Sequence, residues 1–203
     1  MTINWYGQTC FKITSQNGKD GQVNIIIDPP TKESGLRGPK LEADILLSTN
    51  TKNKISNNSY FLIDGPGEYD IKDVYIQGFS SNNGAFIYTL ETEGIKICHL
   101  GKINQSELSS ELVGLLGEID LLFIPIGGGD SLEAKTAVKI MAQIEPKIII
   151  PMNYKIAGLK EKLESIEGFL KLLGIKNLEK MPKLTIKEKD LPKEEVKVIA
   201  LEP

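Results

Sequence analysis

The chain has 203 residues, of which 40% are hydrophobic and 25% charged, so it can bury a core, and we expect a single domain over residues 1–203. Its net charge of −3 argues against nucleic acid and anionic membrane surfaces as partners. No apolar run approaches the ~20 residues needed to span a bilayer, and the N-terminus lacks a signal-peptide pattern. We therefore expect a cytoplasmic protein without a membrane-bound segment.

Short runs of isoleucine, leucine and other apolar residues predict strands in the first half of the chain and again towards its end. Turn-forming pairs such as Asn17-Gly18 and Glu93-Gly94 separate several of these runs. The expected strands cover residues 11–13, 23–30, 43–49, 61–63, 74–76, 85–90, 94–99, 147–154, 184–186 and 196–201.

Three apolar stripes with helical spacing predict helices in the second half of the chain. The first begins at Asn104, which together with a glutamate three residues later fits a capping box, and ends before Gly117. The second covers residues 132–144, with Asp130 and Glu133 repeating the capping signal at its start, and the third covers residues 159–173. Strands followed by strand–helix units are typical of a mixed α/β fold with its sheet at the centre.

Four of the expected strands run directly into polar loops, which carry Asp28, Asn50, Lys102 and Asn153. In α/β proteins, binding sites are built in the loops at the carboxyl ends of strands. His99, the only histidine of the chain, ends one of these strands and has the pKa range of a general base. A lone histidine beside an apolar strand is more often a buried structural residue, and we expect that role here.

Taken in order, these loops resemble those of the metallo-β-lactamase superfamily, and in particular its small predicted zinc-dependent hydrolases, which include ascorbate-6-phosphate-lactonase-like proteins. The resemblance implies an α/β fold of the metallo-β-lactamase type, a four-layer αββα sandwich with the active site where the two sheets meet at one edge. The family would use zinc or manganese. The segments that carry the resemblance are Ile26-Ile27-Asp28-Pro29, the stretch from Ala43 to Ile55, Gly65-Pro66-Gly67-Glu68-Tyr69, Ile97-Cys98-His99-Leu100-Gly101-Lys102 and Pro151-Met152-Asn153-Tyr154.

The resemblance also implies which positions held the metal, and it implies that Asp28 braces the metal-binding loop. The family motif Thr-His-x-His-x-Asp-His aligns with Thr49 to Ile55, so that Asn50, Lys52 and Lys54 replace ligands. A histidine expected around Ser81 is absent, Lys102 stands where a metal-bridging aspartate belongs, and Asn153 replaces the last histidine. On this alignment every ligand position is substituted, so we expect neither a bound metal nor a catalytic residue.

The leading functional expectation is therefore a degenerate, metal-free protein (a pseudoenzyme) that acts in binding or assembly. A small anionic ligand would occupy the former metal site, held by Lys52, Lys54 and Lys102. The ammonium group of one of these lysines would lie near Asp28 and replace the metal electrostatically. The alternative is a metal-dependent hydrolase with a rebuilt or weak metal site, and a purely structural subunit is a third option. The sequence leaves open whether the chain forms a homo-oligomer and whether Ile55 and Tyr154 plug the cleft. The expected ligand-binding positions are Asp28, Asn50, Lys52, Lys54, Ser81, His99, Lys102 and Asn153.

Overall fold

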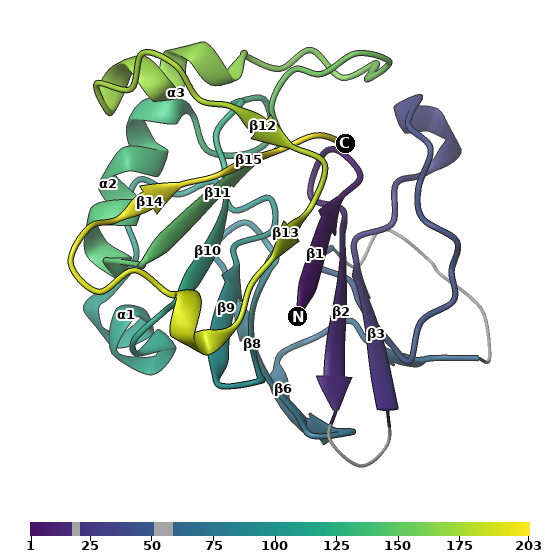
Figure 1. The fold of residues 1–203 in the computed structure, drawn as a ribbon. Helices are drawn as coiled ribbons and strands as arrows, with labels where there is room; N and C mark the ends of the chain where they lie inside the picture. Colours follow the sequence, from purple (N-terminus) through teal and green to yellow (C-terminus); the bar gives the residue numbers. More distant parts are fainter. Residues whose placement is uncertain (18–20, 51–58) are drawn as a thin grey trace.

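Two β-sheets packed face to face form the centre of the molecule in a computed structural model, which describes residues 1–17, 21–50 and 59–203 (Figure 1). The six-stranded sheet has the order β13-β1-β2-β3-β4-β5 and is mixed, because β3, β4 and β5 run parallel while the other pairs are antiparallel. Its strands are β1 (Thr2–Trp5), β2 (Phe11–Asn17), β3 (Gly21–Ile27), β4 (Ile45–Leu47), β5 (Phe61–Ile63) and β13 (Leu184–Thr185).

The seven-stranded sheet has the order β14-β11-β10-β9-β8-β7-β6, with four parallel strands followed by three antiparallel ones. A two-stranded sheet pairs β12 with β15. The strands are β6 (Gly67–Ile71), β7 (Val74–Ser80), β8 (Phe86–Thr92), β9 (Ile95–His99), β10 (Leu121–Pro125), β11 (Ile148–Met152), β12 (Lys180–Met181), β14 (Lys197–Val198) and β15 (Ala200–Leu201).

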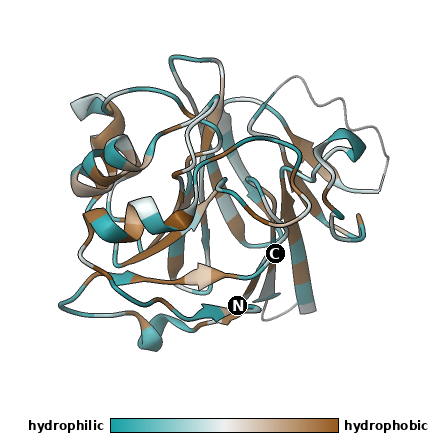
Figure 2. Cartoon of the chain, turned by 90° about the horizontal axis from the view of Figure 1, so that it is seen from above, coloured by the Kyte–Doolittle hydropathy of each residue, from teal (hydrophilic) through white to brown (hydrophobic). Residues whose placement is uncertain are grey.

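The burial of the strands shows which sheet is covered on both faces. Every residue of β10 and β11 is buried, as expected for parallel strands between a helical layer and a second sheet. In β1, buried Ile3 and Trp5 alternate with half-exposed Thr2 and Asn4, so this strand meets the core on one face only, whereas every residue of β4 is buried. Apolar residues accordingly concentrate in the strands at the centre, and the connecting loops are hydrophilic (Figure 2).

The three α-helices are α1 (Ser110–Leu116), α2 (Ala134–Ile144) and α3 (Ile166–Leu172), and they lie beside the seven-stranded sheet (Figure 1). The α/β fold with two mixed sheets confirms the predicted fold class. Between β3 and β4, the described residues form the 3₁₀ turn η1 (Lys32–Ser34). A second 3₁₀ turn, η2 (Glu188–Asp190), precedes β14.

All three predicted helices begin later than the sequence pattern suggests. The α1 helix starts after Ser109, whose side chain accepts a hydrogen bond from the N–H of Leu112, and not at Asn104. Residues 159–165 were expected in the third helix, but the backbone N–H of Lys160 donates to Ser34 and that of Glu164 donates to Gly127. These long-range hydrogen bonds compete with a helical ladder, so α3 keeps only the second half of the predicted helix.

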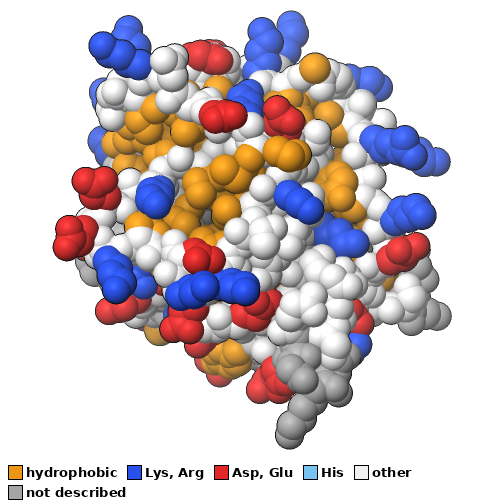
Figure 3. Space-filling model, in the orientation of Figure 1, with side chains coloured by type: hydrophobic (Ala, Val, Ile, Leu, Met, Phe, Trp, Pro, Cys, Tyr) orange, Lys and Arg blue, Asp and Glu red, His pale blue; other side chains and the backbone are white. Residues whose placement is uncertain are grey.

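Charged side chains of both signs are interspersed over the face drawn in Figure 3. Both cysteines, Cys10 and Cys98, are buried free thiols, as the sequence predicts. Among the described residues, no helix is both long and apolar enough to cross a bilayer.

Candidate functional site

A cleft of about 320 Å³ lies where the carboxyl ends of strands from both sheets meet. The six-stranded sheet contributes residues 8–9, 28–31, 33–34 and 49–50 to its wall, and the other sheet contributes Lys102, Asp130 and Glu161. Tyr154 does not plug this cleft, because its ring is fully buried against Trp5, with ring centroids 4.9 Å apart. The predicted site at the carboxyl ends of the strands therefore coincides with an open cleft in the described part of the chain.

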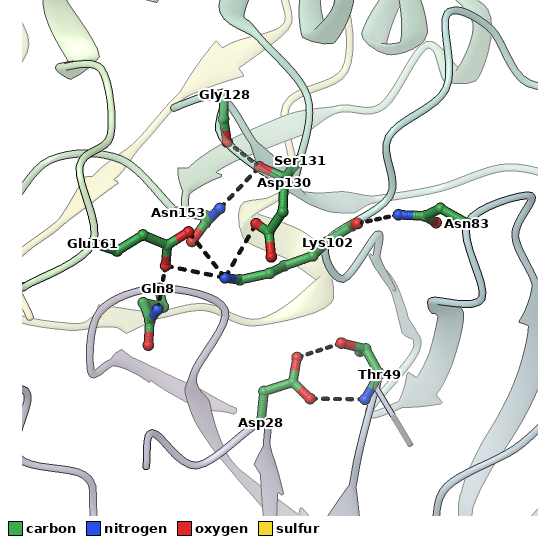
Figure 4. A network of polar contacts seen from close by, with 10 residues as sticks. All are labelled: Gln8, Asp28, Thr49, Asn83, Lys102, Gly128, Asp130, Ser131, Asn153 and Glu161. Atoms are coloured by element: carbon green, nitrogen blue, oxygen red, sulfur yellow. Dashed lines mark hydrogen bonds and ion pairs between the residues drawn. The ribbon is translucent and has the colours of Figure 1, made fainter. Parts of the chain in front are cut away.

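Asp28 follows β3 directly and joins it to the end of β4. Its carboxylate accepts hydrogen bonds from the backbone N–H of Thr49 at 2.7 Å and from the hydroxyl of Thr49 at 2.6 Å (Figure 4). Asp28 is 8% exposed and has a positive φ of 46°, a conformation that is uncommon outside glycine. These contacts fix Thr49, which precedes the loop that the resemblance expects Asp28 to brace.

Lys102 extends from the loop after β9 into the cleft. Its ammonium lies 3.1 Å from a carboxylate oxygen of Glu161 and 3.3 Å from one of Asp130 (Figure 4). Gln8 donates to the same Glu161 carboxylate at 2.6 Å, so this network links the loop before β2 to the opposite sheet. One of the three lysine ammonium groups was expected beside Asp28; that of Lys102 pairs with Asp130 and Glu161. The other two lysines, Lys52 and Lys54, lie outside the described residues, so for them the expectation stays a prediction.

His99 is fully buried at the end of β9, behind the wall of the cleft. Its Nδ1 accepts the backbone N–H of Gly101 at 3.1 Å, and its Nε2 lies 2.9 Å from the carbonyl oxygen of Thr9. A carbonyl can only accept, so Nε2 carries the proton and the ring is neutral. Burial lowers the pKa of His99, more than the nearby Asp28 carboxylate raises it. Both ring nitrogens are thus engaged, as a structural role predicts, and neither is free to bind a metal or accept a substrate proton.

Asn153, at the end of β11, is also fully buried and has a positive φ of 50°. Its side-chain amide donates to the hydroxyl of Ser131 at 2.9 Å, and its backbone N–H donates to the carbonyl oxygen of Gln8 at 3.0 Å. The Oδ1 atom has no hydrogen-bond partner among the described residues. Asn153 therefore supports the wall of the cleft from behind and fixes the loop that carries Gln8.

The remaining predicted site residues are divided between the cleft and other places. Asn50 lines the cleft and forms an isolated bridge with Ala85 of the opposite sheet. Ser81 does not line it; its hydroxyl donates to the carbonyl oxygen of Ala85 at 2.8 Å in a turn. Lys52 and Lys54 lie outside the described residues. The structure thus brings Asp28, Asn50 and Lys102 to the cleft wall, and places His99 and Asn153 behind it.

Three acidic residues of the cleft, Glu33, Asp130 and Glu161, were not predicted as site residues. Asp130 was expected to cap the second helix, but α2 begins after Glu133 and the Asp130 carboxylate is left to pair with Lys102. Glu161 lies in the segment that was expected to be helical, so nothing in its sequence context pointed to the cleft.

Comparisons with known proteins identify the family. Residues 2–153 match the family model of the beta-lactamase superfamily domain. A crystal structure of a predicted Zn-dependent hydrolase of the metallo-β-lactamase superfamily from Thermotoga maritima is 31% identical, with a TM-score of 0.83 over 100% of both chains. The chain belongs to the metallo-β-lactamase superfamily.

Its curated relatives in this superfamily carry the name UPF0173. A UPF0173 protein from Pyrococcus abyssi is 26% identical over 187 residues, 78% of this chain and 85% of the relative. A UPF0173 metal-dependent hydrolase from Thermococcus onnurineus is 33% identical over 119 residues, 51% of this chain and 52% of the relative. These names favour the alternative expectation, a metal-dependent hydrolase, over a metal-free binding protein. The substitution of the relatives' metal ligands in this chain stays a prediction from the resemblance.

The side chains around the cleft show whether this chain has the ligands that a metal site of the superfamily needs. Among the described residues, no three His, Cys, Asp or Glu side chains gather in an arrangement that could hold a metal ion. Residues 51–58 contain none of these four residue types, so that segment has no such side chain to offer the cleft. A catalytic zinc site needs about three such protein ligands. The donor set around the cleft therefore does not fit the metal of the superfamily.

Proposed function

We propose that this member of the metallo-β-lactamase superfamily binds a small polar molecule in the cleft without the help of a metal ion, and that it is not a metal-dependent hydrolase. The proposal places the site where the resemblance to the family expects it, but does not assign metal-dependent hydrolysis to it. The observation that carries it is the state of His99, the only histidine, whose two ring nitrogens are both engaged in buried hydrogen bonds.

The charge of the cleft supports the metal-free part of the proposal. The ammonium of Lys102 lies within 3.3 Å of the carboxylates of Asp130 and Glu161. A divalent cation bound between these carboxylates would be repelled by this ammonium. At 4 Å, two unit charges interact by about 4 kcal/mol at the effective dielectric constant of a protein surface, and a divalent ion doubles this repulsion. Metal binding in the cleft would first require the lysine side chain to move away.

The same charges define which ligands the described part of the cleft suits. Its wall carries the carboxylates of Asp28, Glu33, Asp130 and Glu161 against the single ammonium of Lys102. This balance suits a neutral or amine-bearing polar molecule better than an anion. The predicted anionic ligand depends on Lys52 and Lys54, which lie outside the described residues, and so it stays a prediction.

A metal-dependent hydrolase is the second candidate, and it is the one that the family assignment favours. The Thermotoga maritima relative matches this chain along its whole length, and the relative from Thermococcus onnurineus is itself named a metal-dependent hydrolase. For this chain the candidate requires a metal site built from donors other than a histidine–carboxylate cluster.

Hydrolysis and binding assays on the same preparation distinguish the two candidates. Ester, lactone and phosphodiester substrates, each with added zinc or manganese, should show no turnover above the protein-free rate. A thermal-shift screen of small polar and amine compounds should give ligands whose effect is lost in Glu161→Ala but kept in the neighbouring Lys162→Ala, because only Glu161 lines the cleft. Metal-stimulated turnover that a chelator abolishes would establish the hydrolase instead.

A further inference from the structure

The ammonium of Lys102 sits where two acidic segments converge. Glu161 comes from the irregular segment before α3, and Asp130 comes from the loop between β10 and α2. Lys102 bridges them with contacts of 3.1 and 3.3 Å, and its side chain is 20% exposed. Among the described residues, Lys102 alone forms an ion pair with either of these carboxylates.

The backbone around Lys102 is fixed, so the side chain starts from a defined point, and its ion pairs with Asp130 and Glu161 place the ammonium. Gly101 has a positive φ of 59° and donates its N–H to His99, and a Cβ at this position would lie 2.8 Å from Phe86 and Thr49. The carbonyl oxygen of Lys102 accepts a hydrogen bond from the side-chain amide of Asn83 at 2.9 Å (Figure 4). The lysine therefore leaves a rigid corner between β9 and α1.

We propose that Lys102 is the resident cation of the cleft. Its ammonium fills the place of a bound metal ion, balances the carboxylates of Asp130 and Glu161, and excludes divalent cations by its charge. This inference rests on the proposed metal-free function, and adds to it the residue that makes the cleft independent of metal. It also predicts that the cleft becomes a cation site when the ammonium is replaced by a carboxylate.

The variant Lys102→Asp tests this directly, because a shorter, acidic side chain leaves room for an ion and places three carboxylates around it. Oxygen ligands of this kind suit manganese, magnesium and calcium. Melting temperatures would be measured with and without manganese for the wild type, for Lys102→Asp and for Lys147→Asp. The last is a matched control, because Lys147 pairs with a single carboxylate, Asp120, at an exposed site away from the cleft.

We expect Lys102→Asp to melt below the wild type without metal, to be stabilised by manganese in a concentration-dependent manner, and to retain about one ion per chain after dialysis. Lys147→Asp should show no such rescue. If Lys102→Asp folds and manganese does not change its melting temperature, Lys102 does not occupy a cation site and the inference is wrong. If it fails to fold even with manganese, Lys102→Gln decides: cation-dependent stabilisation of that variant supports the inference, and its absence refutes it.

The two proposals fail separately in this experiment. Manganese-dependent stabilisation of the wild type would refute the metal-free function, whatever the variants do. If manganese changes the melting temperature of neither the wild type nor Lys102→Asp, the metal-free function is kept and only the proposed role of Lys102 is refuted.

Discussion

The Nε2–H group of His99 donates to the carbonyl oxygen of Thr9 across 2.9 Å, and so the only histidine of the chain joins the two sheets. Thr9 belongs to the loop between β1 and β2, whereas His99 ends β9 of the other sheet. Because Thr9 lines the cleft and His99 lies behind it, this contact holds one wall of the cleft in place.

Replacing His99 with phenylalanine should destabilise the fold, because the carbonyl of Thr9 and the N–H of Gly101 would both lose a buried partner. Each unpaired group costs about 1–3 kcal/mol, so we expect a loss of about 2–6 kcal/mol in urea unfolding. Phe123→Leu is the control, because it removes the ring that lies 5.9 Å from His99 and leaves both hydrogen bonds intact. Equal losses in the two variants would contradict the role of the hydrogen bonds.

The stability of the fold should decrease as the pH falls below 6.5, the ordinary pKa of histidine. Burial lowers the pKa of His99 in the folded state against the opposing effect of Asp28, so the unfolded chain takes up the proton first. The contribution is complete above pH 6.5 and declines below it by up to about 1.4 kcal/mol per pH unit, until the lowered pKa is reached. Urea unfolding from pH 7.5 to 5 checks this. His99→Phe should lack this part of the slope, and parallel curves for both proteins would refute the assignment.

The hydroxyl of Thr49 should contribute to stability through its contact with Asp28. Thr49→Val keeps the shape of the side chain but removes the 2.6 Å hydrogen bond to a buried carboxylate. Hydrogen bonds to charged groups contribute about 1.5–3 kcal/mol, and we expect a loss of that size in urea unfolding. Thr49→Ser retains the hydroxyl and should lose less. A valine variant as stable as the serine variant would show that the contact contributes nothing.

Gly127 should not tolerate a side chain, because β10 and β11 end in close contact. A Cβ at this position would overlap the carbonyl oxygen of Asn153 and lie 2.9 Å from the Cα of Tyr154. Both are backbone atoms, so Gly127→Ala should lose about 1–3 kcal/mol or more by thermal unfolding. Gly114→Ala is the matched control: nothing lies within 4 Å of its Cβ in α1, and alanine should stabilise that helix by up to about 1 kcal/mol. Similar melting temperatures for the two variants would contradict this account.

Much of the fold follows from local patterns in the sequence. The apolar runs over 94–99 and 147–154 became β9 and β11, because buried parallel strands have a continuous apolar signature. The strand β6 was not predicted, since its residues Gly67–Ile71 are mostly polar and half-exposed or exposed. The first half of the third predicted helix, residues 159–165, is not helical for another reason. Its apolar residues have helical spacing, but backbone hydrogen bonds to Ser34 and Gly127 hold the segment in an irregular conformation.

The candidate site was predicted in its location and only in part in its members. Asp28, Asn50 and Lys102 were found because they follow strands, and loops at the carboxyl ends of strands share one edge. Glu161 was missed because it reaches the cleft through contacts distant in sequence, with Gln8 and Lys102. Such pairings depend on how the two sheets are placed, which no local pattern encodes.

The metal content of the native protein tests the metal-free cleft most directly. Tag-free protein, purified without a chelator and dialysed against zinc and manganese, would be measured by mass spectrometry, since a histidine tag would itself bind metal. With its one histidine buried and Lys102 between two carboxylates, the chain should carry metal only at the level of the dialysis buffer. One or more tightly held ions per chain would contradict this account and favour the metal-dependent hydrolase.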